Sequence, residues 1–202
     1  MPRIKQRTPA LRDRVLRVAV ATLVSEGAAG FTTRKVAEQA RTSTPAVYEL
    51  FGDKAGLVRE VFFEGFRALR RAFDDLPSTE DPRADLVKLV RAFRRFVVDN
   101  PVLAQVMFSR PFADFDPGPA ERKAGDAVRH FIVGRVRACV EAGVLHGDVT
   151  DIAHVLVALT QGLAATEAAG WLGSSKASIE RRWDLGVGAV LEGLYRSSSS
   201  RP

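Results

Sequence analysis

The stretch between Phe31 and Lys54 restricts the fold of this 202-residue chain more than any other part of it. It reads FTTRKVAEQARTSTPAVYELFGDK, which divides into two short helices around a three-residue turn at 41–43. Thr32 can cap the first helix, because its hydroxyl can accept a hydrogen bond from a free amide of the opening turn. Pro45 fits the first turn of the second helix, where its missing N–H leaves no hydrogen bond unmade. The stretch therefore predicts a helix-turn-helix.

The second helix of this motif has short side chains on its expected outer face. Helical spacing turns Val47 and Phe51 inward. The outward positions are Thr44, Ala46, Tyr48 and Glu49. Such side chains allow a helix to approach base edges in the major groove of DNA, so we expect Thr44 and Ala46 to face bases.

The net charge of +6 lies entirely in the N-terminal part of the chain. Up to Arg59 there are eleven basic residues against five acidic ones, and the remainder has nineteen of each. A basic head on a neutral body is expected of a domain that binds phosphates. A merely solvated basic face is the alternative, and the helix-turn-helix beside it favours DNA.

Several other classes of protein are not expected. There is no Gly-rich phosphate loop, G-x-S-x-G elbow or H-E-x-x-H motif, so the sequence predicts no enzyme and no cofactor. HGDVTD at 146–151, followed by His154, contains possible metal ligands but is better read as a turn and a helix cap, so no metal site is predicted. The single Cys139 fits a reducing cytoplasm and a buried, inert thiol.

Neither a signal peptide nor a membrane span is predicted. The start MPRIKQR is basic but no uninterrupted apolar core follows it. The most apolar run, 152–165, contains His154, Thr160 and Gln161. We therefore expect a cytoplasmic protein without a membrane partner.

Helical spacing recurs along the chain, and no stretch alternates convincingly at period two, so the predicted fold is all-α. Helices are expected at 9–26, at 53–76 after an Asp53 cap, and at 83–100, 101–109, 119–142, 150–169 and 175–197, with Gly27 ending the first. A loose basic arm (1–8), a polar linker at 77–82 marking a domain boundary, and a loop at 110–118 complete the chain. The predicted domains are a three-helix DNA-binding domain (1–56), a larger helical domain (57–197) and a disordered tail (198–202).

The segment from Phe31 to Leu57 resembles the DNA-binding segment of the tetracycline-repressor (TetR) family. The resemblance rests on the run TTRKVA, on PAVY at the start of the second helix, and on Phe51 followed by Lys54. Two positions differ, since the family usually has Gly where Arg41 stands and an aromatic residue or His where Leu50 stands. Arg41 can occupy a left-handed turn position at modest cost, whereas Leu50 removes one expected phosphate contact.

The resemblance implies a ligand-responsive transcriptional regulator, most simply a repressor that binds a palindromic operator in double-stranded DNA as a homodimer. It implies a guanine contact for Arg34 and phosphate contacts for Thr33, Tyr48 and Lys54. The predicted DNA-binding set is Thr32, Thr33, Arg34, Thr44, Ala46, Tyr48, Glu49 and Lys54. The alternative functions are a DNA-binding protein without an effector and a helical small-molecule-binding protein without operator recognition.

The larger domain is rich in apolar residues, which suit a packed core and also the effector site that the resemblance implies. The predicted ligand-binding residues are Phe93, Phe96, Val97, Met107, Phe108, Phe112, Phe131 and Gln161. Two apolar stripes on the last two helices could complete the monomer core or form a four-helix dimer interface, which the resemblance favours. The predicted interface residues are Val155, Leu159, Leu163, Trp183, Val187, Val190, Leu191 and Leu194.

Overall fold

The computed structural model describes residues 8–108 and 118–196, and within these ranges it is helical and contains no strand. The all-α prediction is confirmed. The predicted arm before Thr8, the predicted ligand residue Phe112 and the predicted tail lie outside the described residues. Packing divides the chain into two units, one formed by 1–68 and 102–124, the other by 69–101 and 125–202.

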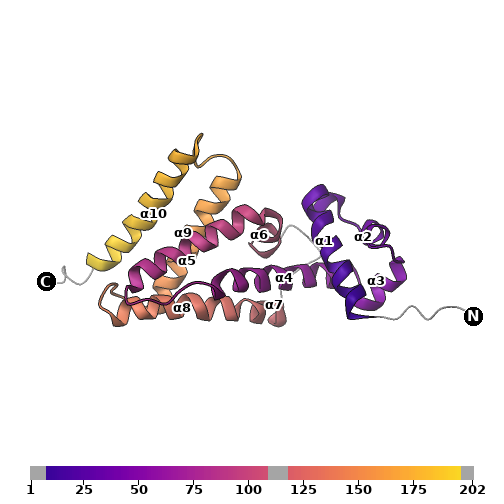
Figure 1. Cartoon of the computed structure of the whole chain (residues 1–202), viewed down its shortest axis with the longest axis horizontal. Coiled ribbons are helices and arrows are strands. Elements are labelled where there is room, and N and C mark those ends of the chain that lie inside the picture. Colours follow the sequence, from indigo (N-terminus) through magenta and orange to yellow (C-terminus); the bar gives the residue numbers. More distant parts are fainter. Residues whose placement is uncertain (1–7, 109–117, 197–202) are drawn as a thin grey trace, which may run out of the picture. The chain divides into compact units, whose positions relative to one another are not determined.

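The first unit contains the N-terminal helices (Figure 1). It comprises α1 (Pro9–Gly30), α2 (Thr33–Gln39), α3 (Thr44–Phe51), most of α4 (Lys54–Asp74), nearly all of α6 (Pro101–Phe108), and α7 (Pro119–Ala124). Thr8 caps α1 by accepting a hydrogen bond from the Leu11 amide. At Gly27 the backbone leaves the helical region (φ 68°, ψ −177°), so α1 is kinked where the sequence predicts its end.

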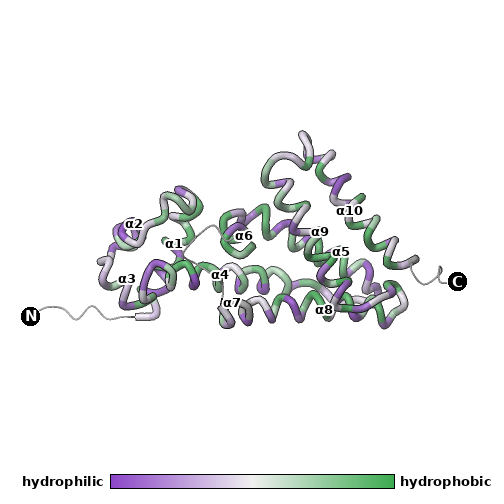
Figure 2. Tube along the Cα trace, turned by 180° about the vertical axis from the view of Figure 1, so that it is seen from behind, coloured by the Kyte–Doolittle hydropathy of each residue, from purple (hydrophilic) through white to green (hydrophobic). Residues whose placement is uncertain are grey.

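The second unit contains α5 (Pro82–Asp99), α8 (Asp126–Glu141), α9 (Val149–Ala168) and α10 (Lys176–Arg196). Within it α5 packs on α8 and α9, and α9 also packs on α8 and α10. Figure 2 shows hydrophobic and hydrophilic residues interleaved along α10, as expected of an amphipathic helix. The single helix predicted at 119–142 is interrupted at Gly125, a weak helix former that separates α7 from α8 although its backbone angles stay helical (φ −73°, ψ −16°).

The division between the units falls inside α4, between Ala68 and Leu69, and not at the predicted 77–82 linker. That linker belongs to the second unit and is held by the buried carboxylate of Asp85. The Thr79 amide and hydroxyl donate to this carboxylate at 2.6 and 3.0 Å, and Arg135 Nη1 lies 3.4 Å from it. The domain limits predicted from sequence, 1–56 and 57–197, stay a prediction.

Cys139 on α8 is fully buried beside the start of α5. Its Sγ donates a hydrogen bond to the Pro82 carbonyl oxygen at 3.2 Å. Burial, with the nearby carboxylates of Asp81 and Asp85, raises the pKa of the thiol to about 11. The thiol is therefore protonated at neutral pH, in keeping with the inert role expected from the sequence.

Among the described residues, one helix, α9, is long and apolar enough by length and composition to cross a membrane, and 28% of its most apolar window is buried inside the protein. It packs against α5, α8 and α10 of the second unit, although most of its residues are not buried within the single chain. For a single helix, length and composition are weak evidence of a membrane span.

Candidate nucleic-acid interface and apolar cavity

The helix-turn-helix is fixed by hydrogen bonds at each helix end. Thr32 Oγ1 accepts from the Lys35 amide at 3.3 Å, and Ser43 Oγ accepts from the Ala46 amide at 3.4 Å. Side-chain caps of this kind satisfy amides that have no partner within the helix.

The turn between α2 and α3 closes with two backbone hydrogen bonds. The Arg41 amide donates to the Glu38 carbonyl at 3.0 Å and the Thr42 amide to the Ala37 carbonyl at 2.9 Å. This is the Schellman arrangement, which requires a left-handed residue after the helix. Arg41 is that residue, with φ 52°.

The motif packs on α1 through a buried apolar face. Val36, Ala37 and Val47 are at most 2% exposed, and Phe51 is 9% exposed, as their inward spacing predicts. Polar contacts fix the orientation, since Arg14 Nε donates to the Ala40 carbonyl at 3.0 Å. α1 thus packs on α2, which packs on α3, and Arg12 of α1 lies over the Phe51 ring of α3.

The start of α4 approaches the end of α3 closely. Asp53 Oδ1 accepts from the Gly56 amide at 2.7 Å and so caps α4. A Cβ atom at Gly56 would lie 1.8 Å from the Phe51 carbonyl oxygen. A residue larger than glycine cannot occupy this position without moving one of the two helices.

The predicted DNA-binding residues differ in exposure. Thr32, Arg34, Tyr48, Glu49 and Lys54 are exposed, Thr44 and Ala46 are half-buried, and Thr33 is buried. The Arg34 side chain is 84% exposed, and its Nε donates to Glu38 Oε1 at 3.0 Å. Tyr48 is 45% exposed. Arg34 and Tyr48 therefore extend from a capped, packed motif into solvent.

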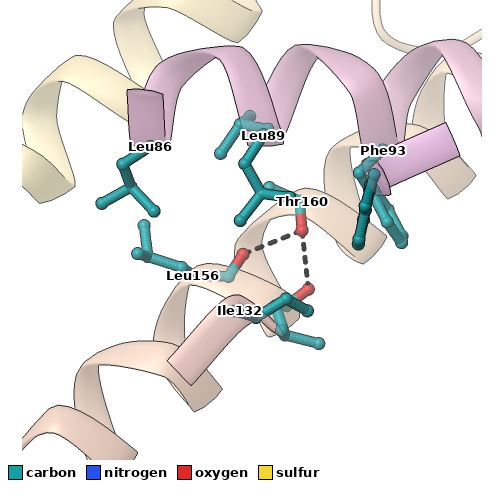
Figure 3. A pocket seen from close by; sticks show the side chains of 9 residues that line it. Leu86, Leu89, Phe93, Ile132, Leu156 and Thr160 are labelled. Carbon is teal, nitrogen blue, oxygen red and sulfur yellow. Dashed lines mark hydrogen bonds between the residues drawn. The ribbon is translucent and has the colours of Figure 1, made fainter. Parts of the chain in front are cut away.

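The second unit contains a small apolar cavity of about 30 Å³, shown in Figure 3. Its walls come from the end of α4 and from α5, α8 and α9. The lining residues are Phe73, Leu86, Leu89, Val90, Phe93, Ile132, Leu156, Val157 and Thr160. Among these described lining residues only Thr160 has a polar side chain, and its hydroxyl donates to the Leu156 and Val157 carbonyls at 2.9 and 3.0 Å.

Two charged clusters hold α5 to its neighbours. In the sequence, one cluster precedes the cavity-lining residues of α5 and the other follows them. Asp85 precedes Leu86, and the hydrogen bonds from Thr79 lower the pKa of its carboxyl. Arg94 follows Phe93, and its guanidinium donates to both oxygens of Glu167 at 2.8 and 2.9 Å. Each cluster joins α5 to another element of the same unit.

The Arg94 cluster extends to α10. Arg94 Nη1 lies 2.8 Å from Glu180 Oε2, and its guanidinium lies 5.2 Å from the Trp183 ring. Trp183 Nε1 donates to Glu167 at 2.6 Å. Hydrogen bonds from Arg94 and then Trp183 lower the pKa of Glu167, and the Glu167 contact raises the pKa of Arg94. Both groups are therefore charged at neutral pH and fasten α5, α9 and α10 together.

The structure places the predicted ligand residues in different surroundings. Of the described ones, only Phe93 lines the cavity. Phe96 and Val97 are buried elsewhere on α5, while Met107 packs against Gly65 and Phe108 against Phe66 in the first unit.

The remaining two ligand candidates belong to the second unit. Phe131 stacks on Phe73 at 5.6 Å, with Arg70 and Arg135 over its ring. Gln161 is half-buried. The predicted ligand residues do not include the aliphatic walls of the cavity, although Leu86, Leu89, Val90 and Phe93 recur at helical spacing that marks one face of α5.

The predicted interface residues are also divided. Trp183, Val187 and Leu191 are at most 6% exposed within the single chain, so they complete the packing of α10 on its own unit. Leu159 and Leu163 approach Gly186 of α10, and with Val190 and Leu194 they are half-buried. Val155 is 49% exposed.

The alternative metal ligands near 146–154 have local roles. Asp148 Oδ1 accepts from the Thr150 and Asp151 amides at 2.8 and 3.0 Å and caps α9. His154 Nδ1 lies 2.8 Å from the Thr150 carbonyl oxygen. Within 8–108 and 118–196, no group of three or more His, Cys, Asp or Glu side chains is placed to hold a metal ion.

Two family models and several known proteins are similar to this chain. The model of bacterial regulatory proteins of the tetR family matches residues 15–61, and that of the tetracyclin repressor-like C-terminal domain matches residues 86–190. A tetracycline repressor protein, class A, of Escherichia coli is 29% identical over 77% of this chain and 66% of its own length. An HTH-type transcriptional regulator of Mycobacterium tuberculosis is 28% identical over 63% of this chain and 54% of its own length.

This chain thus spans between about half and two thirds of the length of these relatives. A solved structure of a protein of unknown function from Rhodococcus sp. RHA1 has the same fold, with a TM-score of 0.80, 25% identity, and coverage of 96% of this chain and 100% of its own. The two family models account for both the capped N-terminal motif and most of the helical body. The chain therefore belongs to the tetR family of bacterial regulatory proteins.

Proposed function

We propose that this regulator is a repressor that binds a palindromic operator as a homodimer and leaves it when a small molecule binds the helical body. The observation that carries the proposal is the exposure of Arg34 and Tyr48 on a motif whose inner face is packed on α1. A rigid motif with exposed polar side chains can meet the base edges and phosphates of a major groove. Because the proposed target is operator DNA in the genome, the proposed role is cytoplasmic and non-enzymatic.

The net positive charge of the N-terminal part supports phosphate binding. Phosphate contacts supply affinity that falls as salt rises, whereas base contacts choose the site. Arg34 is the candidate for a base contact, because guanine accepts two hydrogen bonds from one guanidinium. Its Nε already donates to Glu38, which leaves both Nη groups to form the fork.

The proposed dimer interface uses the exposed face of α9 together with α10. Val155, Ala158, Gly162 and Ala165 recur at helical spacing on α9 and are all exposed. Leu185 on α10 is 72% exposed. A second copy of this chain would cover these apolar side chains, and the small residues would allow close helix approach.

The proposed response to an effector runs along α4. Phe73 on α4 lines the apolar cavity. The first turn of the same helix is capped beside Phe51, the last residue of α3 (the proposed reading helix, Thr44–Phe51). A ligand that changes the packing around Phe73 can thus change the position of α4. Such a ligand must bind the two states with unequal affinity, since otherwise it shifts no equilibrium.

Fluorescence anisotropy with the DNA that flanks the gene, in excess competitor and at two salt concentrations, tests the proposal. We expect saturation at two chains per site and weaker binding at higher salt. Arg34→Ala should cost about 1 to 3 kcal/mol of specific binding.

The matched control is Arg129→Ala. Arg129 also forms an ion pair on a helix surface, with Asp126 at 2.8 Å, so its loss removes the same charge from the body. If both variants weaken operator binding equally, the effect is one of overall charge. Binding abolished by competitor would instead favour a small-molecule-binding protein without operator recognition.

A further inference from the structure

The cavity in the second unit restricts the chemistry of the molecule that can bind there. All of its described lining residues except Thr160 present only carbon atoms from their side chains (Figure 3). A charged or strongly polar ligand would lose its hydration there without gaining hydrogen bonds. The walls therefore favour an apolar, uncharged ligand.

Thr160 offers one specific polar contact. It is 5% exposed, and its hydroxyl hydrogen is directed to the Leu156 and Val157 carbonyls. The cavity surface is almost wholly apolar as it stands, so the walls must move to expose this oxygen. A hydroxyl oxygen has two lone pairs, and once exposed it can accept one hydrogen bond from a ligand. A bound molecule with one O–H or N–H donor would use this capacity.

The charged residues next to the lining residues on α5 are already paired. Arg94 is committed to Glu167 and Glu180, and Asp85 receives hydrogen bonds from Thr79. A ligand carboxylate or ammonium group would have to break one of these clusters. Neither cluster is thus a counter-ion for a charged effector.

The cavity is too small for such a ligand as it stands. Its volume of about 30 Å³ is roughly that needed by two water molecules, whereas a cavity of about 150 Å³ accommodates benzene. Ile132 and Val157 are half-buried and form the solvent-side edge of the described lining. Entry of a single ring requires the side chains of the walls to move.

We propose that the effector is a small, uncharged, apolar molecule of about one ring with a single hydrogen-bond donor, bound in this cavity with its donor on Thr160. This inference rests on the proposed effector response and names its ligand class. Because the ligand opens walls that include Phe73, it binds a repacked state better than the resting one. That unequal affinity is what an effector needs.

Phenol, toluene and benzoate are the probes, since they share a ring and differ in donor and charge. Binding is measured by thermal shift and by titration calorimetry on the full chain. Phenol should bind about threefold to tenfold more tightly than toluene, as one hydrogen bond allows, and benzoate should not bind. Thr160→Val should remove the preference for phenol.

Thr166→Val is the matched control, because the Thr166 hydroxyl also donates to a carbonyl of α9, that of Gly162, but does not line the cavity. It should leave the preference unchanged. Leu156→Ala enlarges the cavity and should strengthen toluene binding, and Leu89→Ala serves if that variant does not fold. Benzoate binding as tight as that of phenol would overturn the inference, as would absence of toluene and phenol binding in the wild type and in the enlarged variant.

Operator anisotropy without any probe separates this inference from the proposed function. Operator binding that persists while no probe binds rejects the ligand class and leaves the DNA-binding role standing. Probe binding with the expected phenol preference in a chain that binds no operator supports the cavity assignment and rejects the repressor.

Discussion

At the scale of single residues, Gly56 has the least freedom to change. Its amide donates to the Asp53 cap, and the Phe51 carbonyl oxygen occupies the place of any Cβ atom. The contact joins the end of the reading helix to the first turn of α4. Even a methyl group at this position must push these two elements apart.

Gly56→Ala is expected to destabilise the protein by about 1 to 3 kcal/mol, because the added methyl group overpacks a close backbone contact. Chemical denaturation measures this loss. Gly134→Ala on α8 is the control, since a Cβ atom there meets no described atom within 4 Å, and it should gain about 0.5 to 1 kcal/mol through helix propensity. Equal stability of the two variants would contradict the steric argument.

The helix-turn-helix could be predicted because its caps and its turn depend on residues close together in the sequence. Contacts between residues far apart in the sequence could not be predicted in this way. The caps at Thr32 and Asp53 and the left-handed turn at Arg41 depend on neighbours within a few residues, so the sequence reveals them. The clash at Gly56 and the pairing of Arg94 with Glu167, 73 positions away, depend on how helices pack. Sequence spacing alone does not contain that information.

At the scale of elements, the ion cluster around Arg94 decides how α5, α9 and α10 are held. The side chains of Arg94 and Glu167 are 16% and 15% exposed, so water screens them little. Glu180, which contacts the same guanidinium, is 47% exposed. The two carboxylates therefore differ in what they contribute to stability.

Glu167→Gln should lower the free energy of unfolding by about 1.5 to 3 kcal/mol at neutral pH, because it weakens charge-assisted hydrogen bonds with Arg94. Glu180→Gln should cost less than about 1 kcal/mol, as expected of a more exposed pair. Thermal unfolding of both variants beside the wild type tests the difference. A larger loss of stability in Glu180→Gln would show that Glu180, the more exposed carboxylate, contributes more than Glu167 to holding the three helices together.

The same cluster predicts a pH dependence. The pKa of Glu167 is lowered in the folded state, so its contribution is complete above the ordinary glutamate pKa of about 4.5 and is lost as the pH falls through the folded value. The stability gap between wild type and Glu167→Gln should thus be constant from pH 7 to about 5 and shrink below about 4.5. A gap that widens on acidification would reverse the sign of the argument.

At the scale of the whole molecule, the prediction concerns assembly. Gly162 lies on the exposed face of α9, and a Cβ atom there meets no described atom within 4 Å. Gly162→Glu should therefore leave the single chain folded, place a carboxylate in the proposed interface, and convert dimers to monomers in sedimentation experiments. Operator affinity should fall with it.

Gly134→Glu on α8 makes the same substitution at another exposed helical glycine with open space around its Cα. It should leave the dimer and operator binding unchanged. Dimers that survive Gly162→Glu would remove this face of α9 from the proposed interface. The interface predicted from sequence on α9 and α10 includes Trp183 and Leu191, which the single chain itself buries. An apolar stripe alone does not reveal whether its own chain or a partner covers it.

The rate at which a reagent modifies the buried thiol of Cys139 can report on local opening of the second unit. A disulfide reagent reacts with thiolates, so the single cysteine is modified only when Pro82 and the start of α5 separate from α8. The modification rate therefore measures opening of the body in unlabelled protein, and an effector that repacks the body should change that rate. Cys139 should react slowly while α5 stays packed on α8. A second cysteine introduced on the reading helix could therefore be labelled selectively, without first replacing Cys139 by another residue.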